Sequence, residues 1–126
     1  MRIERKFTQA GSSPYAAIAF RKIDIEICHA DPKQRVCITD FEVPANWSYS
    51  ASEFLVKHYV CKHDVASRLK PLTEKGVPTW LRRMEIDKDA LLKMAREDHF
   101  GPETSAKQIF HRLAGAWTYW GWNLGY

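Results

Sequence analysis

Long apolar runs are absent from this chain of 126 residues. No stretch approaches the roughly 18 consecutive apolar residues of a membrane-spanning helix, and the charged N-terminus lacks the apolar core of a secretory signal. We therefore expect a cytoplasmic protein with no membrane partner.

Short catalytic motifs are also missing. The six glycines are dispersed and form no phosphate-binding loop. No G-x-S-x-G nucleophile motif occurs, and no two acidic residues stand out as an acid–base pair. The residues alone therefore predict a structural or binding module and not an enzyme.

Cysteine is scarce, with residues at positions 28, 37 and 61 only. An odd number without C-x-x-C spacing favours a reducing compartment over a disulfide scaffold. His58, Cys61 and His63 are residue types that bind zinc, and they fall close together. Their H-x-x-C-x-H spacing matches no closed zinc motif and a fourth ligand is not evident, so we predict no metal site.

Positive charge is in small excess, with 19 Lys and Arg against 15 Asp and Glu. The two signs are interleaved, whereas nucleic-acid-binding proteins usually concentrate positive charge on one face or helix. The C-terminal aromatic residues allow an alternative, a stacking platform for single-stranded nucleic acid. No basic residue follows Arg112, so core or interface packing is favoured and no nucleic-acid partner is expected.

The N-terminal part predicts an arm and then a β-hairpin. Residues 1–14 are expected to form the arm, which ends in a turn-forming Gly-Ser-Ser-Pro stretch. Residues 15–126 are expected to form one small α+β domain. Within it, isoleucines at positions 23, 25 and 27 alternate with polar residues, and Val36 and Ile38 continue this period of two in a second strand.

The sequence between these strands suggests a pairing register. Asp31-Pro32-Lys33-Gln34 suits a type I turn. A turn centred between Pro32 and Lys33 places Ile27 opposite Ile38 and Cys28 opposite Cys37. The isoleucines then face inward and the cysteines outward, as two reduced thiols or, alternatively, as a disulfide.

About four helices are expected after the second strand, which Pro44 ends. Ser50 and Glu53 have capping-box spacing, which predicts a helix over residues 51–62. Phe54, Leu55, His58 and Tyr59 are expected to line one face of this helix, with Val56 and Val60 beside them. A second, short helix is expected at Trp80-Leu81, just after a proline.

A third helix is expected to begin at Asp87 and to end near Gly101-Pro102. Its apolar residues are Leu91, Leu92 and Met94.

The last helix has the clearest pattern. Ser105 and Gln108 again have capping-box spacing, and Gly121 is expected to end the helix. The helix carries more large apolar side chains than its own length can bury, so it requires a partner surface. That partner is either the hairpin with the first helix or a surface outside this chain. We predict an interface formed by Ile109, Leu113, Trp117, Trp120 and Trp122.

The segment from Glu103 to Trp122 resembles a segment near the start of adenosylcobalamin-dependent (class II) ribonucleotide reductases. Its Trp-Thr-Tyr-Trp-Gly-Trp run is specific because tryptophan is rare. Earlier stretches are similar in the same order, so the resemblance covers nearly the whole chain. They are Met1-Arg2-Ile3-Glu4-Arg5 with Phe7, Glu42-Val43-Pro44 with Trp47-Ser48, and Gly76-Val77-Pro78 with Trp80-Leu81.

The resemblance implies a radical enzyme that reduces ribonucleotides to deoxyribonucleotides for DNA synthesis. Adenosylcobalamin would generate a cysteine thiyl radical, and a cysteine pair would supply electrons, all within a barrel that follows the matched segment. No cysteine of this chain lies in a stretch that matches a catalytic motif of the family. We therefore expect no catalytic, cofactor-binding or metal residue here, and no activity from this chain alone.

The resemblance also implies a partner. The expected role is that of a non-catalytic N-terminal domain that packs on the catalytic barrel through the tryptophan-rich helix. The alternative is a stand-alone interaction or regulatory module that docks on another protein through the same helix.

Overall fold

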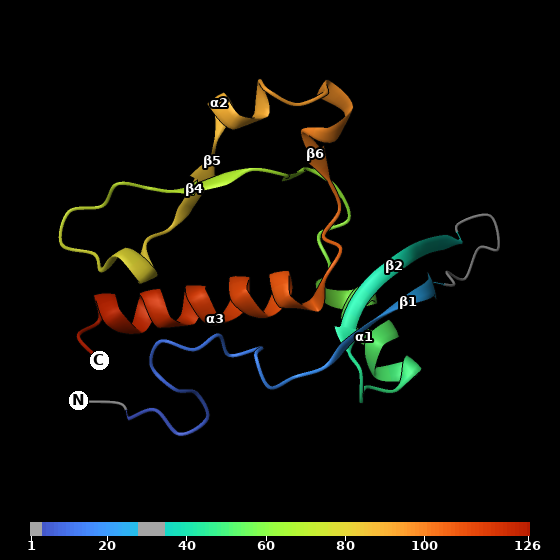
Figure 1. Ribbon diagram of the computed structural model, residues 1–126, viewed down its shortest axis with the longest axis horizontal. Coiled ribbons are helices and arrows are strands. Elements are labelled where there is room, and N and C mark those ends of the chain that lie inside the picture. Colours follow the sequence, from blue (N-terminus) through green and yellow to red (C-terminus); the bar gives the residue numbers. More distant parts are fainter. Residues whose placement is uncertain (1–3, 28–34) are drawn as a thin grey trace. The chain divides into compact units, whose positions relative to one another are not determined.

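The computed structural model describes residues 4–27 and 35–126, and their fold is mixed α+β (Figure 1). An N-terminal hairpin, two smaller two-stranded sheets and a long C-terminal helix are present. The α+β class, the hairpin and the C-terminal helix are confirmed. The expectation of about four helices is wrong: the described residues form three α-helices, because the turn at Thr79–Leu81 (η2) is a 3₁₀ helix.

Residue contacts divide the chain into two compact units. The first comprises Met1–Val60, Thr104–Phe110 and Tyr126, and the second comprises Cys61–Glu103 and His111–Gly125. The arm over residues 1–14 and the single domain over residues 15–126 stay predictions.

The hairpin of the first unit consists of β1 (Phe20–Ile27) and β2 (Val36–Pro44), paired antiparallel. Pro44 ends β2 as expected. The predicted register is wrong by two residues, because Ile38 pairs with Ile25 and Cys37 pairs with Glu26. A slip of two leaves every side chain on its predicted face, so alternation alone does not fix the pairing.

Cys28 and the predicted turn at residues 31–34 lie outside the described residues. A β-bulge interrupts the register. Ile23 pairs with Phe41 and Ile25 with Ile38, so β2 has one residue more than β1 between these pairs. Asp40 has a positive φ of 54°, and its N–H donates to Asp24 Oδ1 at 2.9 Å. This bulge shifts the register between the two ends of the hairpin.

The core of the first unit lies on the inward face of this hairpin. Ile25, Ile27, Phe41 and Val43 are fully buried, and Cys37 on the other face is exposed, as predicted. Helix α1 (Tyr49–Tyr59) contacts β1 and contributes buried residues to the core. They are Ser52, Leu55 and Val56.

The predicted start and predicted face of α1 need correction. Its N-cap is Ser48, whose Oγ accepts from the Ala51 N–H at 3.2 Å, and not Ser50. The helix therefore begins and ends earlier than predicted. Leu55 of the predicted face is buried, but Phe54 is 58% exposed and Tyr59 46% exposed. Ser52, Leu55 and Val56, at positions i, i+3 and i+4, form the buried side of the helix, and Phe54 points away from that side.

The second unit contains very short strands. β3 (Val65–Ala66) pairs with β6 (Phe100–Gly101), and β4 (Leu69–Pro71) pairs with β5 (Met84–Ile86), both antiparallel. None of these strands was predicted.

A short helix follows β5. Asp87 caps α2 (Lys88–Leu91), as predicted, through a 3.0 Å hydrogen bond from the Ala90 N–H. The predicted extension of α2 to Gly101 is wrong. A 3₁₀ turn, η3 (Arg96–Asp98), and strand β6 follow α2, and pairing with β3 holds residues 100–101 in extended backbone.

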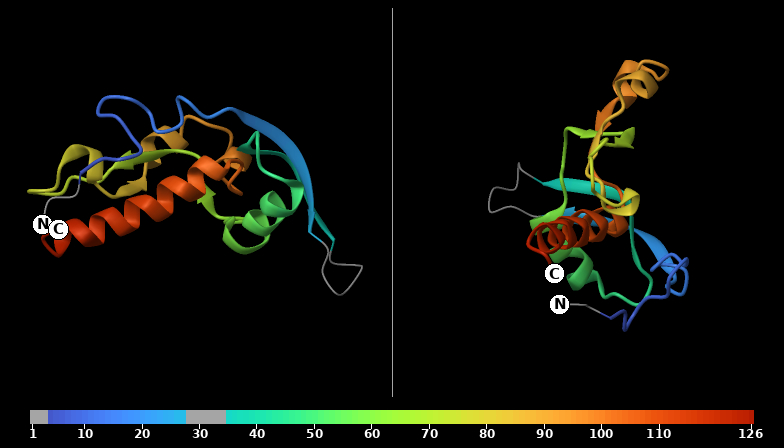
Figure 2. Two further views of the ribbon diagram at one scale, coloured as in Figure 1. Left: turned by 90° about the horizontal axis from the view of Figure 1, so that it is seen from below. Right: turned by 90° about the vertical axis from the view of Figure 1, so that its left-hand side faces the viewer.

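Helix α3 (Ala106–Asn123) is one continuous helix (Figure 2). The Ser105 N–H donates to Gln108 Oε1 at 3.0 Å, which is one half of the predicted capping box, and Ser105 Oγ accepts from the Lys107 N–H at 3.2 Å instead of from the Gln108 N–H. Gly121 does not end the helix. The end lies at Asn123, followed by Gly125 with a φ of +83°, the left-handed backbone that favours glycine. No helix in the described ranges is both long and apolar enough to span a membrane.

Candidate interaction surface on the C-terminal helix

The predicted interface residues all lie in α3, and their exposure changes along the helix. Ile109 is fully buried and Leu113 is half-buried, whereas Trp117 is 65% exposed and Trp120 61% exposed. These positions are spaced by three or four residues and therefore share one side of the helix. One apolar stripe is thus covered at its start and open to solvent at its end.

Trp122 lies on a different side of α3. Two residues beyond Trp120, it is turned by about 200° around the helix axis. Its ring lies 6.4 Å from that of Tyr119, between centroids, and its exposed fraction is 36%. The structure therefore brings the other four predicted residues into one stripe and places Trp122 on the opposite side of the helix.

The open part of the stripe belongs to a stretch without charge. Residues 113–126 contain no Lys, Arg, Asp, Glu or His. Leu124 adds a further side chain that is 76% exposed. This surface can bury apolar area against a neutral partner, and its indole N–H groups require hydrogen-bond acceptors in that partner.

Tyr119 makes its side-chain contacts with other residues of the second unit. Its hydroxyl donates to Glu74 Oε1 at 2.8 Å, and the Arg83 guanidinium lies 5.3 Å from its ring centroid. Arg83 also pairs with Glu74, with Nη2 2.7 Å from Oε1. The hydrogen bond from the Arg83 backbone N–H is the main reason why the pKa of Glu74 lies below its usual value. These contacts fix the rotation of α3 within its unit.

A buried carboxylate anchors the same half of α3. Glu103 is 3% exposed and accepts from Arg112 Nε at 3.0 Å and Nη2 at 3.1 Å. Its Oε2 also accepts from the Cys61 N–H at 2.9 Å, and its own N–H donates to the Cys61 carbonyl at 2.8 Å. The hydrogen bond to this carboxylate raises the pKa of Arg112. Glu103 therefore joins the two ends of the 61–103 segment and holds α3 against them.

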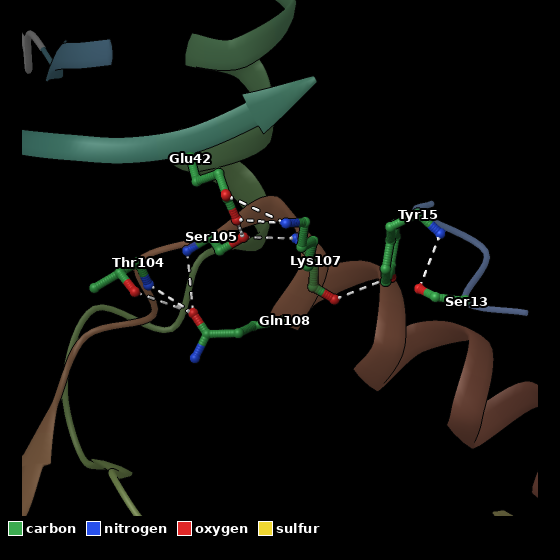
Figure 3. A network of polar contacts seen from close by, with 7 residues as sticks. All are labelled: Ser13, Tyr15, Glu42, Thr104, Ser105, Lys107 and Gln108. Carbon is green, nitrogen blue, oxygen red and sulfur yellow. Dashed lines mark hydrogen bonds and ion pairs between the residues drawn. The ribbon is translucent and has the colours of Figure 1, made fainter. Parts of the chain in front are cut away.

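A second polar network, within the first unit, holds the first turn of α3 (Figure 3). Ser105 Oγ donates to Glu42 Oε1 at 2.6 Å, and Lys107 Nζ donates to Glu42 Oε2 at 3.2 Å. The Ser105 hydrogen bond is the main reason why the pKa of Glu42 lies below its usual value. Tyr15 donates to the Lys107 carbonyl at 3.3 Å, and burial raises the pKa of Tyr15.

The described residues do not fit a corrinoid or a metal ion. No three His, Cys, Asp or Glu side chains in residues 4–27 and 35–126 converge on one point. His58 instead contacts the Phe54 ring, with centroids 4.5 Å apart. A shallow depression beside α1 has too few lining side chains to surround a macrocycle. They are Ser50, Glu53, Phe54, Lys57 and His58.

Comparison with known proteins gives concordant matches. The family model described as "Class II vitamin B12-dependent ribonucleotide reductase" matches residues 21–126. The vitamin B12-dependent ribonucleotide reductases of Bradyrhizobium diazoefficiens and Agrobacterium fabrum are 46% and 43% identical over 126 residues. These alignments cover 100% of this chain and 10% of each relative, so the chain spans about a tenth of their length.

Proposed function

Because this chain belongs to the class II vitamin B12-dependent ribonucleotide reductases and matches their N-terminal region, we propose that it is a non-catalytic N-terminal domain. The enzyme reduces ribonucleotides to deoxyribonucleotides for DNA synthesis. The domain packs on the catalytic barrel through the open part of the α3 stripe.

The change in exposure along α3 carries this proposal. Ile109 and Trp120 share one side of the helix, yet the first is fully buried and the second 61% exposed. Exposed tryptophans on a stretch without charge are typical of surfaces that another protein covers. A neutral, apolar surface of the barrel is the partner that fits this stretch.

The cysteines support a non-catalytic role. Cys37 is exposed on the outer face of the hairpin, and the backbone N–H and carbonyl of Cys61 are bound to Glu103. Neither of these two described cysteines lies in a stretch that matches a catalytic motif of the family, and Cys28 lies outside the described residues. Adenosylcobalamin supplies radical chemistry when bound, and we assign its site to the barrel.

A chimaeric enzyme tests the proposal. Residues 1–126 replace the matching region of the Bradyrhizobium diazoefficiens reductase, and nucleotide reduction is measured with adenosylcobalamin. Amide hydrogen exchange of α3 is compared between the free chain and the chimaera. We expect an active chimaera in which the 113–123 amides exchange about tenfold more slowly, because covering the stripe suppresses local opening.

Matched tryptophan variants sharpen this test. Trp117→Ser with Trp120→Ser should abolish the added protection and lower activity, whereas Trp80→Ser should change neither. Trp80 is a suitable control because it is 74% exposed and lies on η2 of the same unit. Equal exchange in the free chain and an active chimaera would contradict the proposal and favour a stand-alone module with another partner.

A further inference from the structure

The β4–β5 ribbon of the second unit has one apolar and one charged face. Leu69 lies directly opposite Ile86, and Pro71 opposite Met84. Side chains of directly opposed residues share a face, and positions two apart along a strand share it too. On the other face Lys70 Nζ lies 3.8 Å from Glu85 Oε1.

The apolar face of this ribbon is open. Leu69 and Met84 are each 49% exposed, and Ile86 is 42% exposed. Hydrogen bonds beyond the strands extend the ribbon at both ends, from the Leu72 N–H to the Arg83 carbonyl at 2.8 Å and from the Asp87 N–H to the Arg68 carbonyl at 3.1 Å. The ribbon is therefore a formed element with an uncovered face.

The N-terminal hairpin is an internal comparison. It also has one apolar face, but Ile25, Ile27 and Phe41 on that face are fully buried. Two-stranded ribbons are marginal in water unless their apolar face packs against another element. The hairpin obtains that cover within this chain, and the β4–β5 ribbon does not obtain it from the described residues.

The size of the open face limits its occupant. Stable contacts between separate proteins bury about 800 Å² on each side, with roughly 20–30 residues. The few side chains of this face fall far short, so a second copy of the chain bound there alone would dissociate. A surface already held nearby has an effective concentration of up to about millimolar and can cover a small patch.

The geometry points to a second docking face on this domain: the apolar face formed by Leu69, Pro71, Met84 and Ile86 packs on an uncharged surface of the reductase polypeptide that accompanies this region. This inference rests on the proposed function, because the α3 contact supplies the proximity. Relatives about ten times as long carry the matching region within one polypeptide, which provides the required connection.

Hydrogen exchange in the same chimaera tests both contacts separately. We expect the amides of residues 69, 70, 72 and 84–87 to exchange more slowly in the chimaera than in the free chain, by about tenfold. Protection of α3 without protection of the ribbon would overturn this inference and leave the proposed function intact. Protection of neither would overturn both. Concentration-dependent protection of the ribbon in the free chain would overturn it in favour of a second copy.

Paired substitutions on the two faces provide the control. Leu69→Thr with Ile86→Thr removes apolar surface while keeping good strand formers, and Lys70→Thr with Glu85→Thr does the same to the charged face. The first pair should abolish the added protection of the ribbon in the chimaera. The second pair should leave it in place. If both double variants lost the added protection, that protection would depend on the stability of the ribbon itself, and the inference would be overturned.

Photo-crosslinking remains informative if the free chain or a variant does not fold. A benzophenone amino acid is placed at position 69 or, as the control, at position 70 of the chimaera, and nucleotide reduction confirms folding. Crosslinks from position 69 to residues beyond the grafted region are expected, with few or none from position 70. Absence of such crosslinks from position 69 in an active chimaera would overturn the inference.

Discussion

Arg112 on α3 donates two hydrogen bonds to the buried carboxylate of Glu103, from Nε at 3.0 Å and from Nη2 at 3.1 Å. The same carboxylate accepts the Cys61 N–H. A single side chain thereby holds both ends of the 61–103 segment and the helix that follows it.

Glu103→Ala should lower the free energy of unfolding by about 2 kcal/mol. Breaking a buried ion pair usually costs roughly 3–5 kcal/mol, and the cost is smaller here because the Arg112 side chain is 42% exposed. The variant also leaves the Cys61 N–H without its acceptor. Urea unfolding measures the change, with the exposed Glu97→Ala as control. Equal stability of the two variants would refute the anchoring role.

Glu42 should make stability depend on acid pH. Its folded pKa lies below the usual value of 4.5, chiefly through the Ser105 hydrogen bond. A lowered folded pKa means that the stabilisation is complete above pH 4.5 and is lost as the pH falls through the folded pKa. The stability difference between the wild type and Glu42→Gln should therefore shrink below pH 4.5. Chemical unfolding across this range measures it, and a constant difference would contradict the prediction.

Ser48 and Ser50 offer a direct test of the α1 cap. Ser48→Ala should lower the free energy of unfolding by about 1 kcal/mol, because it removes the acceptor of the Ala51 N–H. Ser50→Ala should change it by less than about 0.5 kcal/mol, as is usual for surface substitutions. Urea unfolding of both variants decides between them. A larger loss of stability for Ser50→Ala than for Ser48→Ala would support Ser50 as the N-cap, as the capping-box spacing predicted.

Cys37 should react faster with a thiol reagent than Cys61. Cys37 is exposed on the outer face of the hairpin, whereas Cys61 is only partly accessible. Reaction with Ellman's reagent in a Cys28→Ser background, compared with Cys28→Ser/Cys37→Ser, gives the two rates. Equal rates would indicate that the hairpin face is covered in solution.

Patterns that repeat several times along one element could be read from the sequence, and the pairing of very short strands could not. The alternation around Ile25 and Ile27 predicted the buried face of the hairpin, and the spacing from Ile109 to Trp120 predicted the α3 stripe. The register was wrong by two residues because a slip of two leaves the alternation unchanged, and alternation does not reveal the bulge at Asp40 either. Strands of two or three residues, such as β3 and β6, are too short to show any period.

The sequence indicated the exposed tryptophans of α3, but it did not indicate the carboxylates that hold this helix in place. Its tryptophans are conspicuous because of their spacing and the absence of nearby charge. Glu42 and Glu103 gave no comparable signal, because their partners depend on the tertiary fold. Glu42 lies 63 positions from Ser105, and no local rule connects such distant residues.

The stretch without charge after Arg112 also determines how a contact made there would respond to its surroundings. Only tyrosine could ionise among the side chains of residues 113–126, so ionic strength and pH near neutrality would have little influence on the contact. Burial of apolar area weakens on cooling and carries a negative heat-capacity change. Cold, rather than salt or acid, is the condition that would loosen a contact made through this stretch.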